Sequence, residues 1–257
     1  MKVTGTKNKT DLYKIDKITP SQRKDCEKFI ARRQSGAPLQ YVIGETCFYG
    51  YDIKCDARAL IPRFDTEIVA DEAIKLIKKI PKAEVLDLCT GTGAIAIAIK
   101  KNCDCTVTAT DISRDALLLC EENRDLSQVD FEILCGSLFR PVKKRKFDLI
   151  VSNPPYIPSG DIATLDKEVK EFEPRLALDG GADGLDYYRD IISGAVSRLK
   201  KGGYLVLEAG INQAELIKGI AEEKYECEFV KDMNDPPIDR VVILKLKDEY
   251  FVEENKE

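Results

Sequence analysis

VLDLCTGTGA, residues 85–94, is a short apolar run that passes into a turn rich in glycine and threonine. The pattern predicts a strand over 84–88 and a helix over 93–101. Glycines let a backbone approach a ligand closely, and the helix that follows such a turn aims its N-terminus at the same place. A second predicted strand, 106–110, is followed by Asp111, at about the distance onward where an acidic residue holds ribose hydroxyls. These features predict a nucleoside or nucleotide site, although a structural tight turn has the same residues.

The alternation of strands and helices continues outward from this run. We expect further strands at 131–134, 147–152, 203–208, 225–230 and 240–246, and helices after Ser113, over 188–199 and from about 212. Upstream, we expect a loosely held lead-in to about residue 20, a helix over 22–33, a hairpin over 46–55, and a helix that starts at Asp65 or Thr66 and stops before Pro81. This order predicts an α/β fold with a mostly parallel sheet covered on both faces.

Composition excludes several classes of protein. The 257 residues contain no histidine, which removes Ser-His, Cys-His and His-metal mechanisms. The nine cysteines are odd in number and include no C-x-x-C pair, so we expect reduced thiols, with neither a disulfide framework nor a metal site. Since the net charge is −5 and no apolar run approaches the length of a membrane span, we expect a soluble cytoplasmic protein with no membrane partner and no direct nucleic-acid partner.

The turn after the first strand also bears on the cofactor. It lacks the third glycine of the G-x-G-x-x-G dinucleotide motif, which disfavours a pyrophosphate. A nucleoside ligand without phosphates, such as S-adenosylmethionine, fits these residues better. An NAD-dependent oxidoreductase remains an alternative at this point.

A second signal, Asn153-Pro154-Pro155-Tyr156, directly follows the apolar strand 147–152. A primary amide or an aromatic amine offers two N–H donors, and its delocalised lone pair makes it a poor nucleophile. The side-chain oxygen of Asn153 and the carbonyl of Pro154 are able to accept both N–H bonds, while neither proline has an N–H that competes with the substrate. Tyr156 would pack on the flat substrate group. The pattern indicates a site that positions an amine nitrogen for methyl transfer without a general base.

These residues resemble the protein-(glutamine-N5) methyltransferases of the HemK/PrmC family, which modify class I peptide chain release factors. The resemblance covers about residues 32–246 and is carried by segments 32–33, 38–39, 61–63, 65–67, 87–95, 111–113, 153–157, 173–174, 177–181, 183–185, 188–189 and 208–210, together with Gln213. The NPPY element is shared with nucleic-acid amine methyltransferases. The segments 62–67 (PRFDTE) and 183–185 (DGL) are more particular to the family.

The resemblance implies the class I S-adenosylmethionine-dependent methyltransferase fold, with a seven-stranded sheet in a catalytic domain over residues 81–257 and a shortened helix and hairpin region over 1–80. It implies that S-adenosylmethionine, and its product S-adenosylhomocysteine, is held by Asp87, Cys89, Thr90, Gly91, Thr92, Gly93, Asp111, Ile112, Ser137, Leu138 and Asn153. It implies that Asn153, Pro154, Pro155 and Tyr156 hold the glutamine of a Gly-Gly-Gln loop in a release factor. We expect the enzyme to be a monomer.

Departures from the family pattern concern four positions and the N-terminus. Cys89 replaces a glycine at the start of the turn, which we expect the turn to accept with a negative φ. Ser137 and Leu138 stand where the family often has an acidic residue and a larger side chain, and Phe64 replaces a proline. The family's helical N-terminal domain, which helps to engage the release factor, is longer than the one helix expected before Arg32.

Several assignments stay open on the sequence alone. Asp87 is expected to bond either the methionine amino group or the loop backbone. Glu208 and Gln213 are expected to line the outer edge of the pocket or to cap a helix, and Arg63 and Glu67 to shape its entrance or to form a surface ion pair. The alternatives for the whole protein are a methyltransferase for a nucleic-acid exocyclic amine (adenine N6 or guanine N2) and an inactive S-adenosylmethionine-binding protein.

Overall fold

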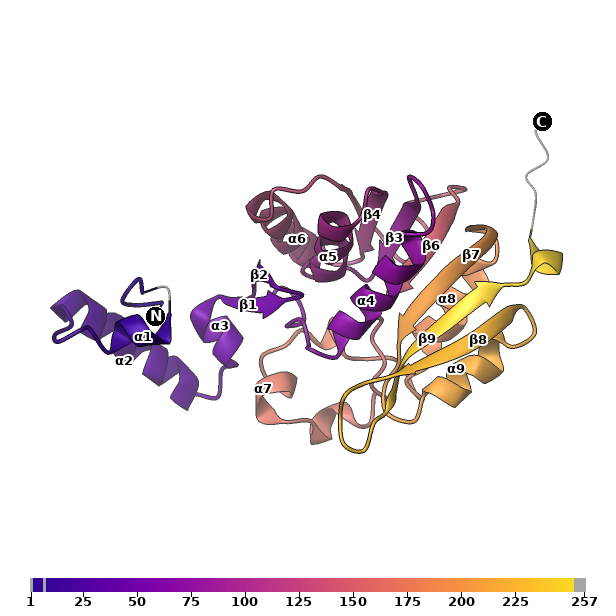
Figure 1. Ribbon diagram of the computed structural model, residues 1–257. Helices are drawn as coiled ribbons and strands as arrows, with labels where there is room; N and C mark the ends of the chain where they lie inside the picture. Colours follow the sequence, from indigo (N-terminus) through magenta and orange to yellow (C-terminus); the bar gives the residue numbers. More distant parts are fainter. Residues whose placement is uncertain (1, 7, 252–257) are drawn as a thin grey trace.

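The computed structural model describes residues 2–6 and 8–251, and within them a seven-stranded sheet forms the centre of the molecule (Figure 1). Its strands lie in the order β5-β4-β3-β6-β7-β9-β8. They are β3 (Glu84–Leu88), β4 (Thr106–Asp111), β5 (Glu132–Cys135), β6 (Phe147–Ser152), β7 (Leu199–Glu208), β8 (Tyr225–Lys231) and β9 (Asp239–Leu246). The neighbours from β5 to β7 are parallel, and β9 runs antiparallel to both β7 and β8. The predicted mostly parallel seven-stranded sheet is confirmed.

Helices cover both faces of this sheet, which explains why its central strands are nearly continuous apolar runs. One face carries α4 (Thr66–Ile77), α5 (Ala94–Asn102) and α6 (Arg114–Leu126), and the other carries α8 (Asp186–Ala195) and α9 (Ala214–Ala221) (Figure 1). Val69, Ile97 and Val151 belong to the first core cluster, whereas Ile150 and Ile191 belong to the second. Successive residues of β6 thus enter opposite cores, as the two-residue period of a strand requires.

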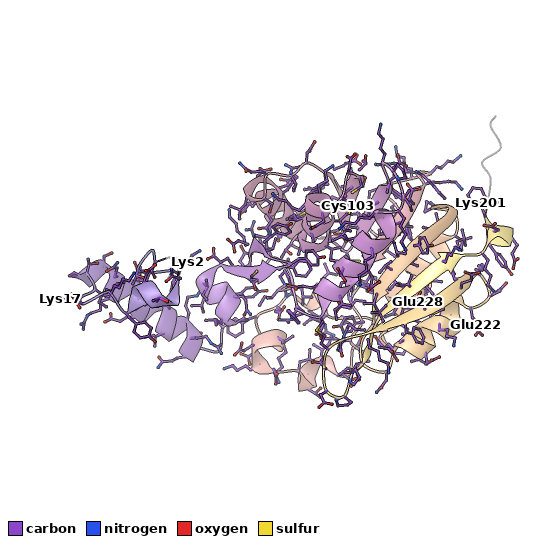
Figure 2. All side chains as sticks on the ribbon, viewed as in Figure 1. Lys2, Lys17, Cys103, Lys201, Glu222 and Glu228 are labelled. Atoms are coloured by element: carbon purple, nitrogen blue, oxygen red, sulfur yellow. The ribbon has the colours of Figure 1, made fainter. Side chains whose placement is uncertain are left out.

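The N-terminal elements stand to one side of the sheet. They are α1 (Lys9–Leu12), α2 (Pro20–Gln34), α3 (Leu39–Ile43) and the hairpin of β1 (Glu45–Phe48) with β2 (Tyr51–Lys54). Figure 2 places Lys17 near the tip of this arm and Lys201 and Glu222 at the opposite end of the molecule. The side chain of Thr19 accepts from the backbone of Gln22 and completes a capping box, so α2 begins two residues before the predicted helix.

The largest differences in bounds concern two predicted elements. The helix predicted over 188–199 ends at Ala195, and Leu199 already belongs to β7. The apolar Leu199 continues the helical spacing by coincidence, because it is buried as the strand partner of Phe147, next to a register shift in the β6–β7 pairing. The predicted strand 203–208 is therefore only the second half of β7.

Short elements of three to five residues escaped prediction because they are too short for a helical hydrophobic pattern to repeat. They are α1, α3, α7 (Lys167–Lys170) and the 3₁₀ turns η1 (Ile162–Thr164), η2 (Arg175–Ala177) and η3 (Asp248–Tyr250). The division of the chain between residues 80 and 81 stays a prediction. Phe48, Ile53 and Val69, which precede that boundary, share one core cluster with Val85 and Ile97, which follow it.

Candidate functional site

The two predicted motifs follow neighbouring strands. Leu88, the last residue of β3, pairs with Ser152, the last residue of β6, and the Ser152 hydroxyl donates to the carbonyl of Leu88 at 2.7 Å. The chain passes from β3 toward β4 and β5 on one side, while β6 and β7 lie on the other, so the strand order reverses between β3 and β6. Ligands of open α/β sheets bind at the carboxyl ends of strands at such a point.

A cavity opens at this place. Of the residues predicted to form the site, those that line it are Cys89, Thr90, Gly91, Thr92, Asp111, Ile112, Ser137, Leu138, Asn153 and Pro155. Four others (Asp87, Gly93, Pro154 and Tyr156) lie outside the lining. Within the described residues no group of three or more His, Cys, Asp or Glu is placed to hold a metal ion.

The turn after β3 has a left-handed backbone at three positions, Cys89 (φ 58°), Gly91 (φ 54°) and Gly93 (φ 81°). The expected negative φ of Cys89 is wrong. The chain leaves β3 through a residue in the left-handed region, where a side chain costs about 1–2 kcal/mol relative to the right-handed region. Position 93 accepts only glycine, because a Cβ there would lie 2.6 Å from the Sγ of Cys120.

Asp111, at the end of β4, holds this turn from the side. One of its carboxylate oxygens accepts the backbone N–H of Gly91 at 2.9 Å, and the other accepts that of Ser113 at 2.8 Å. Burial raises the pKa of the Asp111 carboxyl above its ordinary value. Each oxygen retains a second lone pair at the cavity wall, so the side chain is able to accept hydroxyl donors of a ligand.

Asp87 lies beneath the turn and is fully buried. One of its oxygens accepts the hydroxyl of Thr90 at 2.6 Å, and burial raises the pKa of the carboxyl to about 7. Among the described residues its Oδ1 has no hydrogen-bond partner, and neither has the buried Oγ1 of Thr110, which lines the cavity. Asp87 is therefore bonded to the loop through the side chain of Thr90.

Asn153 belongs to a chain of hydrogen bonds that leads away from the cavity. Its Nδ2 donates to the Oγ1 of Thr66 at 3.2 Å, and the Thr66 hydroxyl donates to the buried carboxylate of Glu208 at 2.6 Å. The hydroxyl of Tyr156 lies 3.5 Å from the other oxygen of Glu208, at the outer limit of a hydrogen bond. Burial raises the pKa of the Glu208 carboxyl to about 7. Glu208 thus neither lines the cavity nor caps a helix.

The backbone of Tyr156 is enclosed by segments from two other places in the chain, Gln213 and the loop that contains Gly180 and Gly184. The side chain of Gln213 donates to the carbonyl of Tyr156 at 2.9 Å, although Gln213 stands at the N-cap position of α9 and makes no capping bond. A Cβ on Gly180 would lie 2.8 Å from the backbone of Tyr156, and one on Gly184 would lie 2.4 Å from its carbonyl oxygen. These glycines let the neighbouring loops close on the NPPY turn.

Another part of the cavity lining comes from segments to which the sequence assigned no ligand role. Its lining residues are Arg58, Ala59, Leu60, Pro62, Thr66, Pro174, Leu176, Ala177 and Tyr187. The buried carboxylate of Glu173 joins two of these segments, since it accepts the N–H of Ile61 at 3.1 Å and pairs with Arg63. Glu67 instead accepts the backbone N–H of Tyr49 at 2.8 Å, so Arg63 and Glu67 do not pair. In the sequence, only the family motifs at 62–67 and 173–174 indicated that these segments belong to the site.

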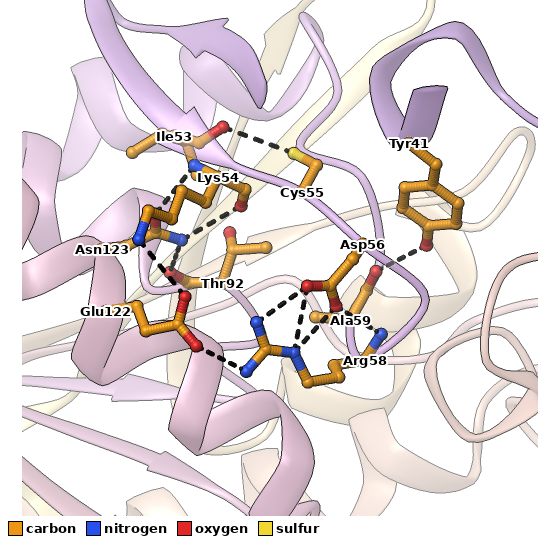
Figure 3. A network of polar contacts seen from close by, with 10 residues as sticks. All are labelled: Tyr41, Ile53, Lys54, Cys55, Asp56, Arg58, Ala59, Thr92, Glu122 and Asn123. Atoms are coloured by element: carbon orange, nitrogen blue, oxygen red, sulfur yellow. Dashed lines mark hydrogen bonds and ion pairs between the residues drawn. The ribbon is translucent and has the colours of Figure 1, made fainter. Parts of the chain in front are cut away.

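A polar network fixes the segment that carries Arg58 and Ala59 (Figure 3). The buried side chain of Asn123, on α6, bonds both the N–H and the carbonyl of Lys54, at 2.7 and 3.2 Å, and donates to the carbonyl of Thr92 at 3.0 Å. The guanidinium of Arg58 bridges Asp56 and Glu122. The hairpin is thereby tied to the same helix that packs against the glycine turn.

Comparisons with known proteins agree with this geometry. The model of the methyltransferase small domain family matches residues 69–172. The release factor glutamine methyltransferase of Geobacter sulfurreducens is 41% identical over 88% of this chain and 79% of its own length. That of Thermodesulfovibrio yellowstonii is 40% identical over 93% of this chain and 87% of its own length.

The chain belongs to the release factor glutamine methyltransferase family. Solved structures agree on the fold. A methyltransferase from Pyrococcus furiosus matches with a TM-score of 0.56 and 18% identity, over 89% of this chain and 99% of its own. The ribosomal protein L11 methylase of Lactobacillus delbrueckii subsp. bulgaricus matches with a TM-score of 0.52 and 24% identity, over 72% of this chain and 80% of its own. The fold is that of the class I S-adenosylmethionine-dependent methyltransferases.

Family membership also decides against an oxidoreductase. The absence of a third glycine alone does not, because the position that corresponds to it is Ala96, and alanine also occurs at that position of the dinucleotide motif. Ala96 is fully buried in α5. A small residue there serves helix–strand packing whichever ligand is bound.

Proposed function

We propose that this chain transfers the methyl group of S-adenosylmethionine to the side-chain nitrogen N5 of the glutamine in the Gly-Gly-Gln loop of a class I peptide chain release factor. The relatives in Geobacter sulfurreducens and Thermodesulfovibrio yellowstonii, both release factor glutamine methyltransferases, support the reaction and the substrate. The observation that carries the proposal in this chain is the orientation of Asn153. Its amide nitrogen is used by Thr66, and its Oδ1 has no hydrogen-bond partner among the described residues.

The residues of the cavity fit a sulfonium nucleoside. Asp111 offers carboxylate lone pairs for ribose hydroxyls, while Ile112 and Leu138 offer apolar surface for a base. The unpartnered buried hydroxyl of Thr110, at the cavity wall, is a polar group of the kind that a hydroxyl-rich ligand satisfies, and the unpartnered oxygen of Asp87 lies beneath the turn, outside the lining. We assign Cys89 to Gly93, Ser137 and Asn153 to the same cofactor. When bound, S-adenosylmethionine supplies an electrophilic methyl carbon.

The chain's own contribution is to position a weak nucleophile. An amide nitrogen has a delocalised lone pair, so its orientation toward the methyl carbon matters more than proton removal before the transfer. Asn153 Oδ1 and the carbonyl of Pro154 would accept the two N–H groups of the substrate. Pro154 and Pro155 are buried and have no N–H, so they offer no competing donor. Tyr156, held through its backbone by Gln213, would pack on the amide.

The partner and the setting belong to the same proposal. We assign a release factor as the protein substrate, with no direct nucleic-acid partner and a monomeric enzyme in the cytoplasm. All nine cysteines are free, as a reducing compartment requires. No helix in the described part of the chain is long and apolar enough to cross a bilayer.

The test is mass spectrometry of a purified release factor after incubation with this protein and S-adenosylmethionine. We expect a gain of one methyl group on the glutamine of the Gly-Gly-Gln loop, and none on a matched release factor with Gly-Gly-Ala. Equal labelling of both release factors contradicts the proposal. Labelling of RNA or DNA under the same conditions, with no labelling of the release factor, would instead indicate a nucleic-acid amine methyltransferase. Binding of the cofactor without any turnover would indicate an inactive binding protein.

A further inference from the structure

The hydrogen-bond chain Asn153–Thr66–Glu208 joins three parts of the fold and runs from the cavity lining, to which Asn153 and Thr66 belong, to the buried Glu208. Asn153 follows β6, Thr66 is the first residue of α4, and Glu208 is the last residue of β7. Thr66 is 4% exposed and Glu208 is 1% exposed, so water does not compete for these bonds. Neither residue was assigned a role in orienting Asn153 by the sequence motifs.

The direction of each hydrogen bond in this chain follows from the chemistry at its buried end. In its ionised form, which prevails above the raised pKa of about 7, the Glu208 carboxylate has only acceptors, so the single proton of the Thr66 hydroxyl points to it, at 2.6 Å. The hydroxyl oxygen then offers only lone pairs to Asn153, which must present its N–H group, at 3.2 Å. The side-chain amide of Asn153 therefore has one favoured orientation, in which its nitrogen points toward Thr66 and its oxygen points away from Thr66.

This orientation matters because the two ends of a primary amide have opposite hydrogen-bonding character. An asparagine turned by 180° would present N–H groups to a substrate amide that itself offers N–H groups. Two donors facing each other make no hydrogen bond, and the substrate nitrogen would lose its positioning. The same 180° rotation of the Asn153 amide would also break its hydrogen bond to Thr66.

We infer that Thr66 and Glu208 are positioning residues, which hold the side-chain amide of Asn153 with its oxygen toward the substrate. The inference rests on the proposed function, since it concerns the substrate-facing end of Asn153. Tyr156 approaches the same carboxylate at 3.5 Å, so Glu208 also links the two outer residues of the NPPY turn.

The test compares Thr66→Val with Thr66→Ser in steady-state methylation of a release factor. Valine keeps the shape of threonine without the hydroxyl, whereas serine keeps the hydroxyl. We expect Thr66→Val to lower kcat about tenfold, the effect of about one well-placed hydrogen bond, and Thr66→Ser to stay within about twofold of wild type. Affinity for S-adenosylmethionine and the thermal midpoint should change little in either variant.

A double-mutant cycle separates positioning from a merely structural role. If Thr66 acts through Asn153, adding Thr66→Val to Asn153→Ala leaves kcat unchanged, because the amide to be oriented is gone. Glu208→Gln should lower kcat several-fold, since a glutamine amide is able to donate to Thr66 and reverse the bond. Full kcat in Thr66→Val, an equal loss in Thr66→Ser, or additive losses in the cycle would overturn the inference and leave the proposed function intact. A wild-type chain that does not methylate the release factor would overturn both.

Discussion

The carboxylate of Asp111 accepts the backbone N–H of Gly91 at 2.9 Å, so the end of β4 holds the turn that follows β3. The two strands are parallel neighbours, and Leu88, the last residue of β3, pairs with Thr110, the residue before the end of β4. The same side chain accepts the N–H of Ser113 at the start of α6. One carboxylate therefore sets the shape of the cavity on the side where we place the ribose.

Asp111→Asn is expected to weaken binding of S-adenosylmethionine about tenfold. The amide has one acceptor oxygen in place of two, so either Gly91 or Ser113 loses a partner, at a cost of about 1–2 kcal/mol in the free energy of unfolding. Isothermal titration and urea denaturation measure the two effects. Asp115→Asn, at an exposed position in the first turn of α6, is the matched control and should change neither. Unchanged affinity in Asp111→Asn would remove this residue from the cofactor site.

Gly93→Ala is expected to destabilise the fold by about 2–4 kcal/mol. The backbone has a φ of 81°, and the new methyl carbon would lie 2.6 Å from the Sγ of Cys120. Gly219→Ala, in the exposed part of α9 where a Cβ meets nothing within 4 Å, should stabilise by up to about 1 kcal/mol. Urea denaturation of both variants checks the contrast, and a stable Gly93→Ala protein would contradict the packing of α6 against the turn.

Asn153→Ala is expected to lower kcat by about 100-fold or more, because the variant loses the oxygen that positions the substrate amide. Affinity for S-adenosylmethionine should stay within several-fold of wild type. The measurement is single-turnover methylation of a release factor together with titration of the cofactor. Asn102→Ala, at the end of α5 and outside the cavity lining, serves as the control with normal turnover. Turnover at the wild-type rate in Asn153→Ala would refute the assigned role.

Glu173→Ala is expected to cost about 2–3 kcal/mol of stability. The carboxylate is 1% exposed in its side chain, and its removal leaves the N–H of Ile61 without an acceptor and Arg63 without a partner. Glu168→Ala breaks the surface pair with Arg33, in which the side chains are 43% and 41% exposed, and should cost at most about 0.5 kcal/mol. Equal losses in the two variants would show that the 61–63 segment is held by other contacts.

Glu208 and Asp87 are expected to make the free energy of unfolding depend on pH. Burial raises the pKa of both carboxyls to about 7, from ordinary values of 4.5 and 3.8. Between those values and pH 7 the folded state binds more protons than the unfolded chain, so these groups make the free energy of unfolding fall as pH rises. Glu208→Gln removes one of them, and its denaturation series from pH 5 to pH 8 should fall less steeply. Parallel curves for the variant and wild type would show that Glu208 ionises normally.

Much of the architecture was predictable because it is local. The runs 84–88 and 147–152 are mostly apolar, with three of five and four of six residues apolar, as expected for strands buried on both faces. Their succession with amphipathic helices then predicts a parallel sheet, and adjacent carboxyl ends bring Gly91 and Asn153 to one cavity. The helix predicted over 188–199 was too long because Leu199 has helical spacing in the sequence, whereas its actual strand partner, Phe147, lies far away in the chain.

The sequence by itself determined the class of fold, the glycine turn and the NPPY turn, since each depends on residue types within a few positions of one another. Only the tertiary structure decided that Cys89 takes a left-handed backbone, that Glu173 joins two segments of the cavity wall, and that Thr66 stands between Asn153 and Glu208. These contacts join residues far apart in the chain. The spacing of residues along a chain carries no information on which buried donor meets which acceptor, because that is set by how the elements pack.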